Sequence, residues 1–197
     1  MTSTYDLITL AEAQTFPGMS NADVSILAAL ITAASLDFET FWDNYGVQRQ
    51  VAERYSYREI KISSAHANTI WLRKLPIVSV ASIVDQDSNA ILSTDYWIDY
   101  DLGALRTTGG WYIPHDANGF ETYWTVTYTA GRVADTASVP ANIKHACKMW
   151  VAELFKNSSQ NVTSKSVGDL RISYKETKGD LPDQIKRMIG AWKKADA

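Results

Sequence analysis

Leu75-Pro76-Ile77-Val78-Ser79-Val80 opens the stretch of sequence that decides the fold. The stretch continues through Tyr96-Trp97-Ile98-Asp99-Tyr100 and Gly103-Ala104-Leu105, and it ends on Thr125-Val126-Thr127-Tyr128-Thr129-Ala130-Gly131. In the last segment apolar and polar residues alternate, which indicates a half-buried strand. None of these segments has the pattern of a catalytic motif, so the stretch predicts a structural scaffold.

The alternation is also present before these segments, where Ile60 and Ile62 alternate with Glu59 and Lys61. Residues typical of turns separate the segments at Gly103, Gly109-Gly110 and Asn118-Gly119. We therefore expect roughly six short antiparallel strands between residues 57 and 130, forming a small sheet or a barrel-like insertion.

Outside this region the period of the apolar residues changes to that of a helix. A first helix is predicted at about 20–45, with Ser20 or Asn21 as its cap and with an apolar stripe of Val24, Leu27, Ile31, Phe38, Phe41 and Tyr45. A second, at about 140–157, follows Pro140 and buries Ile143, Ala146, Cys147, Trp150, Val151 and Leu154. A third, at about 182–194, follows Pro182 and places Ile185, Met188, Ile189 and Trp192 on one face.

Between the last two helices the segments 162–167 and 170–174 flank Gly168-Asp169, which predicts a C-terminal β-hairpin. The predicted fold class is α+β. A helical bundle core with the hairpin comprises residues 1–56 and 131–197, and the antiparallel β insertion comprises residues 57–130.

Composition narrows the class of protein. The 197 residues include 19 Lys and Arg against 22 Asp and Glu, a net charge of −3, which argues against a dedicated nucleic-acid-binding protein. Cys147 is the single cysteine, so an intramolecular disulfide is excluded. No secretory signal is evident, and the apolar segment 24–36 is expected to be too short and too polar to cross a membrane.

None of the candidate motifs for metal binding or catalysis is complete in this sequence. The sequence Asp85-Gln86-Asp87-Ser88-Asn89 begins like a calcium loop, but Ala90 and Tyr96 stand where glycine and glutamate are required, so a polar turn is expected. The three histidines are far apart, and His145 and Cys147 point to different faces of a helix. The sequence contains no phosphate-binding glycine motif. We expect no cofactor, no metal and no catalytic residue.

The aromatic residues allow three interpretations. Seven Trp and ten Tyr are many for this length, and the β region holds Trp71, Trp97, Trp111, Tyr112 and Trp124. Such side chains stack on sugars, fill the core of a small sheet, or form a protein–protein interface. Spacing alone leaves all three open.

The order of these elements resembles the head-tail connector (adaptor, or head completion) proteins of long-tailed phages. The resemblance covers the chain from about Thr9. It rests on the strand segments already quoted, on Asp95-Tyr96, and on Val139-Pro140-Ala141-Asn142-Ile143 and Ser166-Val167-Gly168-Asp169. In this family the helices form the core, and the β region would be an insertion that some members carry.

The resemblance implies a non-enzymatic virion protein at the head-tail junction, made in the host bacterial cytoplasm. Such proteins form a ring, typically dodecameric, under the portal protein. The ring extends the DNA channel and offers a surface to a stopper or tail-completion protein, and a monomer in solution is compatible with this. Mild acidity fits a channel through which double-stranded DNA passes without specific binding, and no membrane partner is expected.

A ring requires two different complementary surfaces on each subunit. We expect one surface, toward the portal or a neighbour, at Leu170, Ile172, Tyr174, Ile185, Met188 and Trp192. We expect another on the β insertion at Trp97, Trp111 and Tyr112. Two alternatives remain: a Trp-rich carbohydrate-binding or receptor-recognition module, and an enzyme whose site is dispersed in sequence and would show perturbed carboxylates or histidines.

Overall fold

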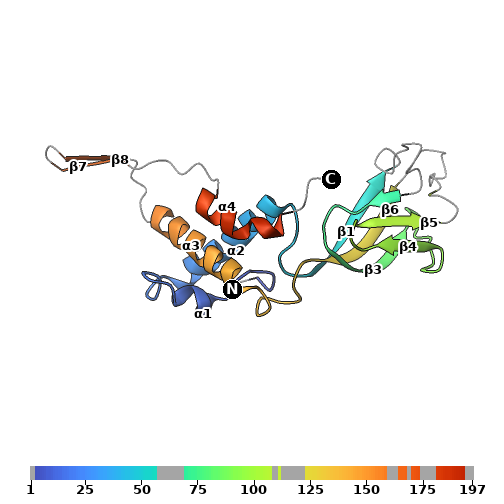
Figure 1. Ribbon diagram of the computed structural model, residues 1–197, viewed down its shortest axis with the longest axis horizontal. Coiled ribbons are helices and arrows are strands. Elements are labelled where there is room, and N and C mark those ends of the chain that lie inside the picture. Colours follow the sequence, from blue (N-terminus) through green and yellow to red (C-terminus); the bar gives the residue numbers. More distant parts are fainter. Residues whose placement is uncertain are drawn as a thin grey trace. The chain divides into compact units, whose positions relative to one another are not determined.

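The computed structural model describes residues 3–56, 69–107, 111, 123–158, 164–167, 170–173 and 181–193. The chain divides into two compact units, residues 1–46 with 135–197, and residues 47–134. The first, the helical unit, contains the helices, and the second, the β unit, contains two three-stranded sheets (Figure 1). The predicted α+β class is confirmed.

The helical unit contains α1 (Leu10–Gln14), α2 (Val24–Trp42), α3 (Ala141–Ser158) and α4 (Asp183–Ile189), followed by a 3-10 turn, η1 (Gly190–Trp192). Helix α2 begins later than expected. Its cap is Asp23, whose carboxylate accepts hydrogen bonds from the backbone N–H groups of Ser25 at 2.8 Å and Ile26 at 3.2 Å. The predicted caps Ser20 and Asn21 are therefore wrong, because a carboxylate nearer the helix satisfies its unpaired N–H groups.

Helices α2 and α3 pack on each other and are buried along the stripes Leu27, Ile31, Phe38 and Trp42 and Ile143, Ala146, Cys147, Trp150 and Val151. Ser35 on α2 joins the N-terminal segment to this layer, because its hydroxyl accepts the N–H of Leu7 at 3.0 Å and donates to the carbonyl of Ile31 at 2.9 Å. Helix α4 packs on α3 and buries Ile185 and Ile189.

In the β unit, β1 (Arg49–Ser56), β6 (Tyr123–Ala130) and β3 (Ile77–Val84) form an antiparallel sheet in the order β1-β6-β3. The second sheet contains β2 (Thr69–Trp71), β5 (Ala104–Thr107) and β4 (Tyr96–Asp99) in the order β2-β5-β4. The alternation predicted for the last strand is correct, since Trp124, Val126, Tyr128 and Ala130 of β6 are all buried.

Strand β1 was not expected, because it lies before the predicted start of the insertion at residue 57. It pairs with β6 along its whole length, from Arg49 opposite Ala130 to Ser56 opposite Tyr123. An inward position of β1 carries Glu53, and this charge disguises the alternation in the sequence. The strand predicted around Ile60 and Ile62 lies outside the described residues.

Gly131 follows directly after β6, at a position where the backbone requires glycine. Its φ is 142°, and a Cβ atom there would lie 2.5 Å from the Cα of Gln48. Glycine is the residue that tolerates both this conformation and this close approach.

The C-terminal hairpin is confirmed as β7 (Ser164–Val167) paired antiparallel with β8 (Leu170–Ser173). Ser164 lies opposite Ser173, and Val167 lies opposite Leu170. Tyr174 and Gly168-Asp169 lie outside the described residues.

Candidate assembly surfaces

The residues predicted for a C-terminal interface occupy two different elements. Leu170 and Ile172 belong to β8, whereas Ile185, Met188 and Trp192 belong to α4 and η1. Ile185 is only 3% exposed and forms part of the interior of the helical unit. Met188 and Trp192 are partly exposed, and the Trp192 ring lies 5.0 Å from the ring of Trp42. Of the three residues on α4 and η1, Met188 and Trp192 therefore remain at the surface.

The two described tryptophans expected on the β-unit surface differ in burial. Trp111 is 9% exposed, its Nε1 donates to the carbonyl of Leu105 at 3.4 Å, and its ring meets Trp124 edge-on at 5.8 Å. Trp111 therefore fills the core of the unit. Trp97 is 48% exposed. Tyr112, the third predicted residue, is outside the described part of the chain.

The pairing of β2, β5 and β4 places a second exposed tryptophan on the same face as Trp97. Thr69, Arg106 and Trp97 form one cross-strand row, and Trp71, Ala104 and Asp99 form the next. Residues two apart on a strand share a face, so Trp71 and Trp97 lie on either side of β5, with Arg106 in the central strand. We call Trp71, Trp97 and Arg106 the tryptophan face.

The tryptophan face has residue types that are common in protein contacts. Trp and Arg are the residues most enriched where binding energy concentrates in interfaces. The Nε of Arg106 is buried and, within the described residues, has no hydrogen-bond partner. Sequence reasoning did not single out Arg106, because cross-strand register is not visible in residue spacing.

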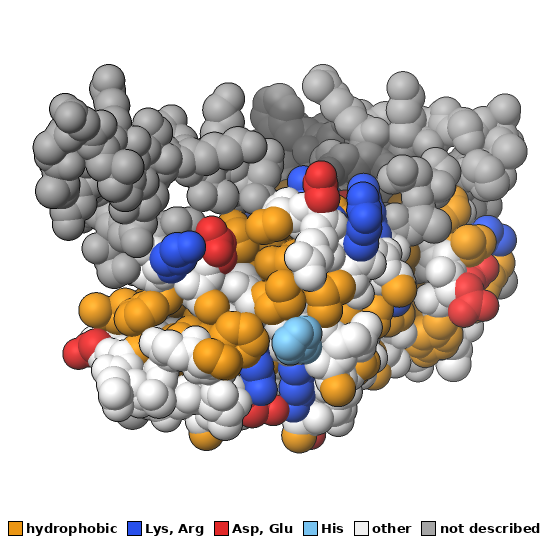
Figure 2. All heavy atoms as spheres, turned by 60° about the vertical axis from the view of Figure 1, so that its left-hand side comes forward, with side chains coloured by type: hydrophobic (Ala, Val, Ile, Leu, Met, Phe, Trp, Pro, Cys, Tyr) orange, Lys and Arg blue, Asp and Glu red, His pale blue; other side chains and the backbone are white. Residues whose placement is uncertain are grey.

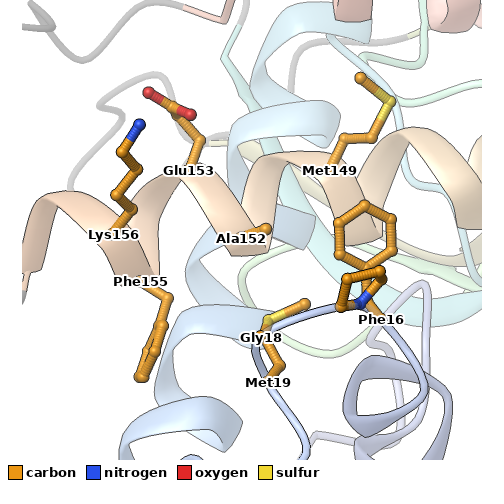
Figure 3. A pocket seen from close by; sticks show the side chains of 9 residues that line it. Phe16, Gly18, Met19, Met149, Ala152, Glu153, Phe155 and Lys156 are labelled. Carbon is orange, nitrogen blue, oxygen red and sulfur yellow. The ribbon is translucent and has the colours of Figure 1, made fainter.

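The helical unit carries a groove of about 490 Å³ between the loop at residues 16–19 and α3, lined by Phe16, Pro17, Gly18, Met19, Met149, Ala152, Glu153, Phe155 and Lys156. Ala152 lies in the middle of the α3 wall (Figure 3). Met149, Glu153 and Lys156 project to one side of it, and Phe155 and Met19 lie on the other (Figure 3). Apart from the charged residues Glu153 and Lys156 at one edge, the lining is apolar.

A family model described as "HCP: Head completion protein" matches residues 6–195, which span both units. The chain belongs to this family. As a head completion protein it is a structural component of the head-tail connector of the virion, and its family is one of structural phage virion proteins. The comparison with curated proteins found no match.

Solved structures confirm the fold of this head completion protein. A chain in the neck of an empty gene transfer agent (GTA) particle, computed with C6 symmetry, matches with a TM-score of 0.67 at 14% identity, covering 100% of this chain and 95% of that one. A chain from the virion of the native GTA particle gives 0.66 at 14% identity, covering 97% and 91%. A chain in the native neck, computed with C12 symmetry, gives 0.62 at 11% identity, covering 100% and 97%.

The polar groups of this head completion protein that resembled chemical sites have structural roles. The carboxylate of Asp85 accepts the backbone N–H groups of Asp87 at 3.0 Å and Asn89 at 2.8 Å, as expected for a polar turn. Burial raises the pKa of the Cys147 thiol to about 12, so the sulfur stays protonated and unreactive. Among the described residues, no group of three or more His, Cys, Asp or Glu is arranged to bind a metal.

Proposed function

We propose that this head completion protein assembles as a ring at the head-tail junction, where it binds the portal protein on one side and a stopper or tail-completion protein on the other. The observation that carries the proposal is the family match over residues 6–195, which includes both units. The whole-chain likeness to neck proteins in particles computed with C6 and C12 symmetry supports a ring.

The charge of the chain supports a channel through which DNA passes. Cationic contacts to phosphate would hold the DNA and make its passage dependent on salt. With 19 basic against 22 acidic residues, the chain has a net charge of −3 and no excess of cations to make such contacts. The ring would therefore enclose the DNA without binding it specifically.

Mixing the protein with its cognate portal and tail-side proteins tests this proposal. We expect electron microscopy to show a ring of added density on one end of the portal, with symmetry matching the neck. The tail-side protein should join only after that ring has formed. Absence of added density at low and at moderate salt would contradict the proposal, and glycan binding by the tryptophan face would then be the next measurement.

We propose further that the hairpin β7–β8 contributes to portal binding by adding a strand to a neighbouring sheet edge. A two-stranded hairpin is marginally stable by itself, and the outer edges of β7 and β8 pair with no strand in the described part of the chain. Pairing through backbone hydrogen bonds is a common way for an extended segment to bind a sheet.

The hairpin is best tested without touching α4, because removing residues 161–197 would also remove the buried Ile185 and Ile189. Residues 164–173 are instead replaced by a Gly/Ser linker of the same length. We expect affinity for the portal to fall at least tenfold while the thermal unfolding of the helical unit is unchanged. Undiminished portal affinity would rule out this role of the hairpin.

The tryptophan face is proposed as a protein contact of the β unit, and it refines the predicted set of Trp97, Trp111 and Tyr112. Two exposed indoles with an arginine in the strand between them match the composition of an interface centre. The density of the assembled ring would show which neighbouring protein this face meets.

A further inference from the structure

Helix α2 is more apolar than a helix at the surface of a soluble unit needs to be. It has 19 residues, and its most apolar window has a mean hydropathy of 1.5. By length and composition alone, such a helix could cross a membrane. Only 39% of that window is buried inside the structure. The sequence-based expectation that this segment is too short is therefore wrong, because the helix continues to Trp42. Its apolar composition calls for something that covers the exposed side.

The two ionisable residues of α2 both accept hydrogen bonds from other parts of the helical unit. Asp37 accepts a hydrogen bond from Nε1 of Trp150 at 2.7 Å. Glu39 is buried and accepts the N–H of Gly46 at 3.1 Å. Asp37 is half-buried, and the exposed positions of α2 carry no charged side chain.

That exposed side is a continuous stripe, which we call the outer stripe, formed by Ile26, Ala29, Ala33, Leu36 and Thr40. The spacing of 3, 4, 3 and 4 residues is the pattern of a seam between two helices. Ile26 and Leu36 are 48% and 52% exposed, and the alanines between them allow another helix to approach closely. Figure 2 shows one face of the molecule, on which hydrophobic side chains also gather among a few charged groups. A helix that is apolar on all sides is normally buried on all sides.

The groove beside α3 offers a complementary surface on another face of the same unit. Ala152 provides a small residue on the α3 wall, and Phe16, Met19, Met149 and Phe155 provide apolar walls (Figure 3). The outer stripe and the groove lie on sides of α2 and α3 opposite the stripes through which these helices pack together. The two surfaces therefore face away from each other.

We propose that the outer stripe of α2 in one copy packs into the α3 groove of the next copy around the ring. The inference rests on the proposed function and identifies the contact between neighbouring subunits. A closed ring needs two different surfaces that face in different directions, and the outer stripe and the groove meet that need. Ile26 and Leu36 are ten residues apart, about 15 Å along the helix, a length suited to helix-in-groove binding. The partly exposed, flexible side chain of Met149 can adapt to such a partner.

Cysteine cross-linking on the portal-bound ring tests this contact. Leu36→Cys and Ala152→Cys are introduced singly and together, and the native Cys147 stays unreactive because it is fully buried. With a bifunctional maleimide, the chain with both substitutions should give a ladder of products up to the full ring. An equimolar mixture of the two single variants should give only dimers, and each single variant alone should give monomers.

The matched control combines Ala11→Cys with Leu36→Cys. Ala11 of α1 is exposed and lies outside both surfaces. This pair should give no ladder. A portal-bound ring without a ladder from the Leu36→Cys and Ala152→Cys chain would overturn the inference and leave the proposed function standing. Dimers from Leu36→Cys alone would indicate a symmetric contact and would also overturn it. Failure of the wild-type protein to form any ring would instead overturn the proposed function.

Discussion

Replacing Trp42 with alanine is expected to lower the free energy of unfolding of the helical unit by about 3–5 kcal/mol. Trp42 is fully buried at the end of α2. Its ring meets Phe38 edge-on at 5.6 Å and Trp192 at 5.0 Å, and its Nε1 donates to the carbonyl of Ile189 at 2.8 Å. The substitution removes an apolar side chain that joins α2 to α4, and it leaves a carbonyl group without its partner.

Urea unfolding followed by circular dichroism measures this loss. Trp42→Phe keeps an aromatic ring but not the donor, so it should cost less, about 1–3 kcal/mol. The control is Trp97→Ala in the β unit, where the side chain is half exposed and the cost should stay within about 1 kcal/mol. A loss below about 1 kcal/mol for Trp42→Ala would mean that Trp42 does not join the two helices energetically.

Trp42 also shows a limit of helical periodicity. The stripe predicted for the first helix contains Val24, Phe41 and Tyr45, whereas the structure exposes Val24 and buries Trp42. Periodicity fixes the orientation of a helix only when one side is polar. Helix α2 is apolar on both sides, so its period is visible in the sequence but the direction of its buried face is not. The outer stripe of α2 has the same cause, namely that the exposed side of this helix is apolar.

Helix α3 is the contrasting case. Its charged side chains lie away from the core, and five of the six residues predicted for its buried stripe are buried, namely Ile143, Ala146, Cys147, Trp150 and Val151. The sixth, Leu154, is half-buried. Spacing also placed Ile185, Met188 and Trp192 on one face of the last helix. It does not indicate whether such a face packs on its own chain or on a neighbour, and Ile185 proves to be part of the interior.

In the β unit the strands whose inward positions are apolar were predictable, and β1 was not. Its inward position at Glu53 is tolerated because two hydroxyl groups satisfy the carboxylate. Glu53 Oε2 accepts hydrogen bonds from the hydroxyl of Tyr55 on the same strand and from that of Tyr128, at 2.8 Å, on β6. No local sequence pattern indicates a partner 75 residues away.

These two tyrosines make the stability of the β unit sensitive to alkaline pH. Burial and, next, the hydrogen bond to Glu53 raise the pKa of both Tyr55 and Tyr128 well above the ordinary value of 10. In the unfolded chain they would lose their protons near pH 10, whereas in the folded chain they keep them. Above pH 10 the folded state therefore binds more protons than the unfolded state, and stability falls as pH rises.

The free energy of unfolding of the β unit should therefore be constant with respect to these groups up to about pH 9. Above about pH 10 it should fall by as much as about 1.4 kcal/mol per pH unit for each tyrosine. Urea unfolding at intervals between about pH 8 and pH 11 measures the slope. The variant carrying Tyr55→Phe and Tyr128→Phe should be less stable at pH 8 but should lose this part of the slope. Tyr100→Phe, which alters a half-exposed tyrosine of the same unit, should leave the slope unchanged. If the free energy of unfolding fell equally steeply with pH in the wild type and the double variant, the two buried hydroxyl groups would not be the cause of the alkaline loss. A tyrosine contributes to this slope only if it keeps its proton in the folded state and loses it in the unfolded state.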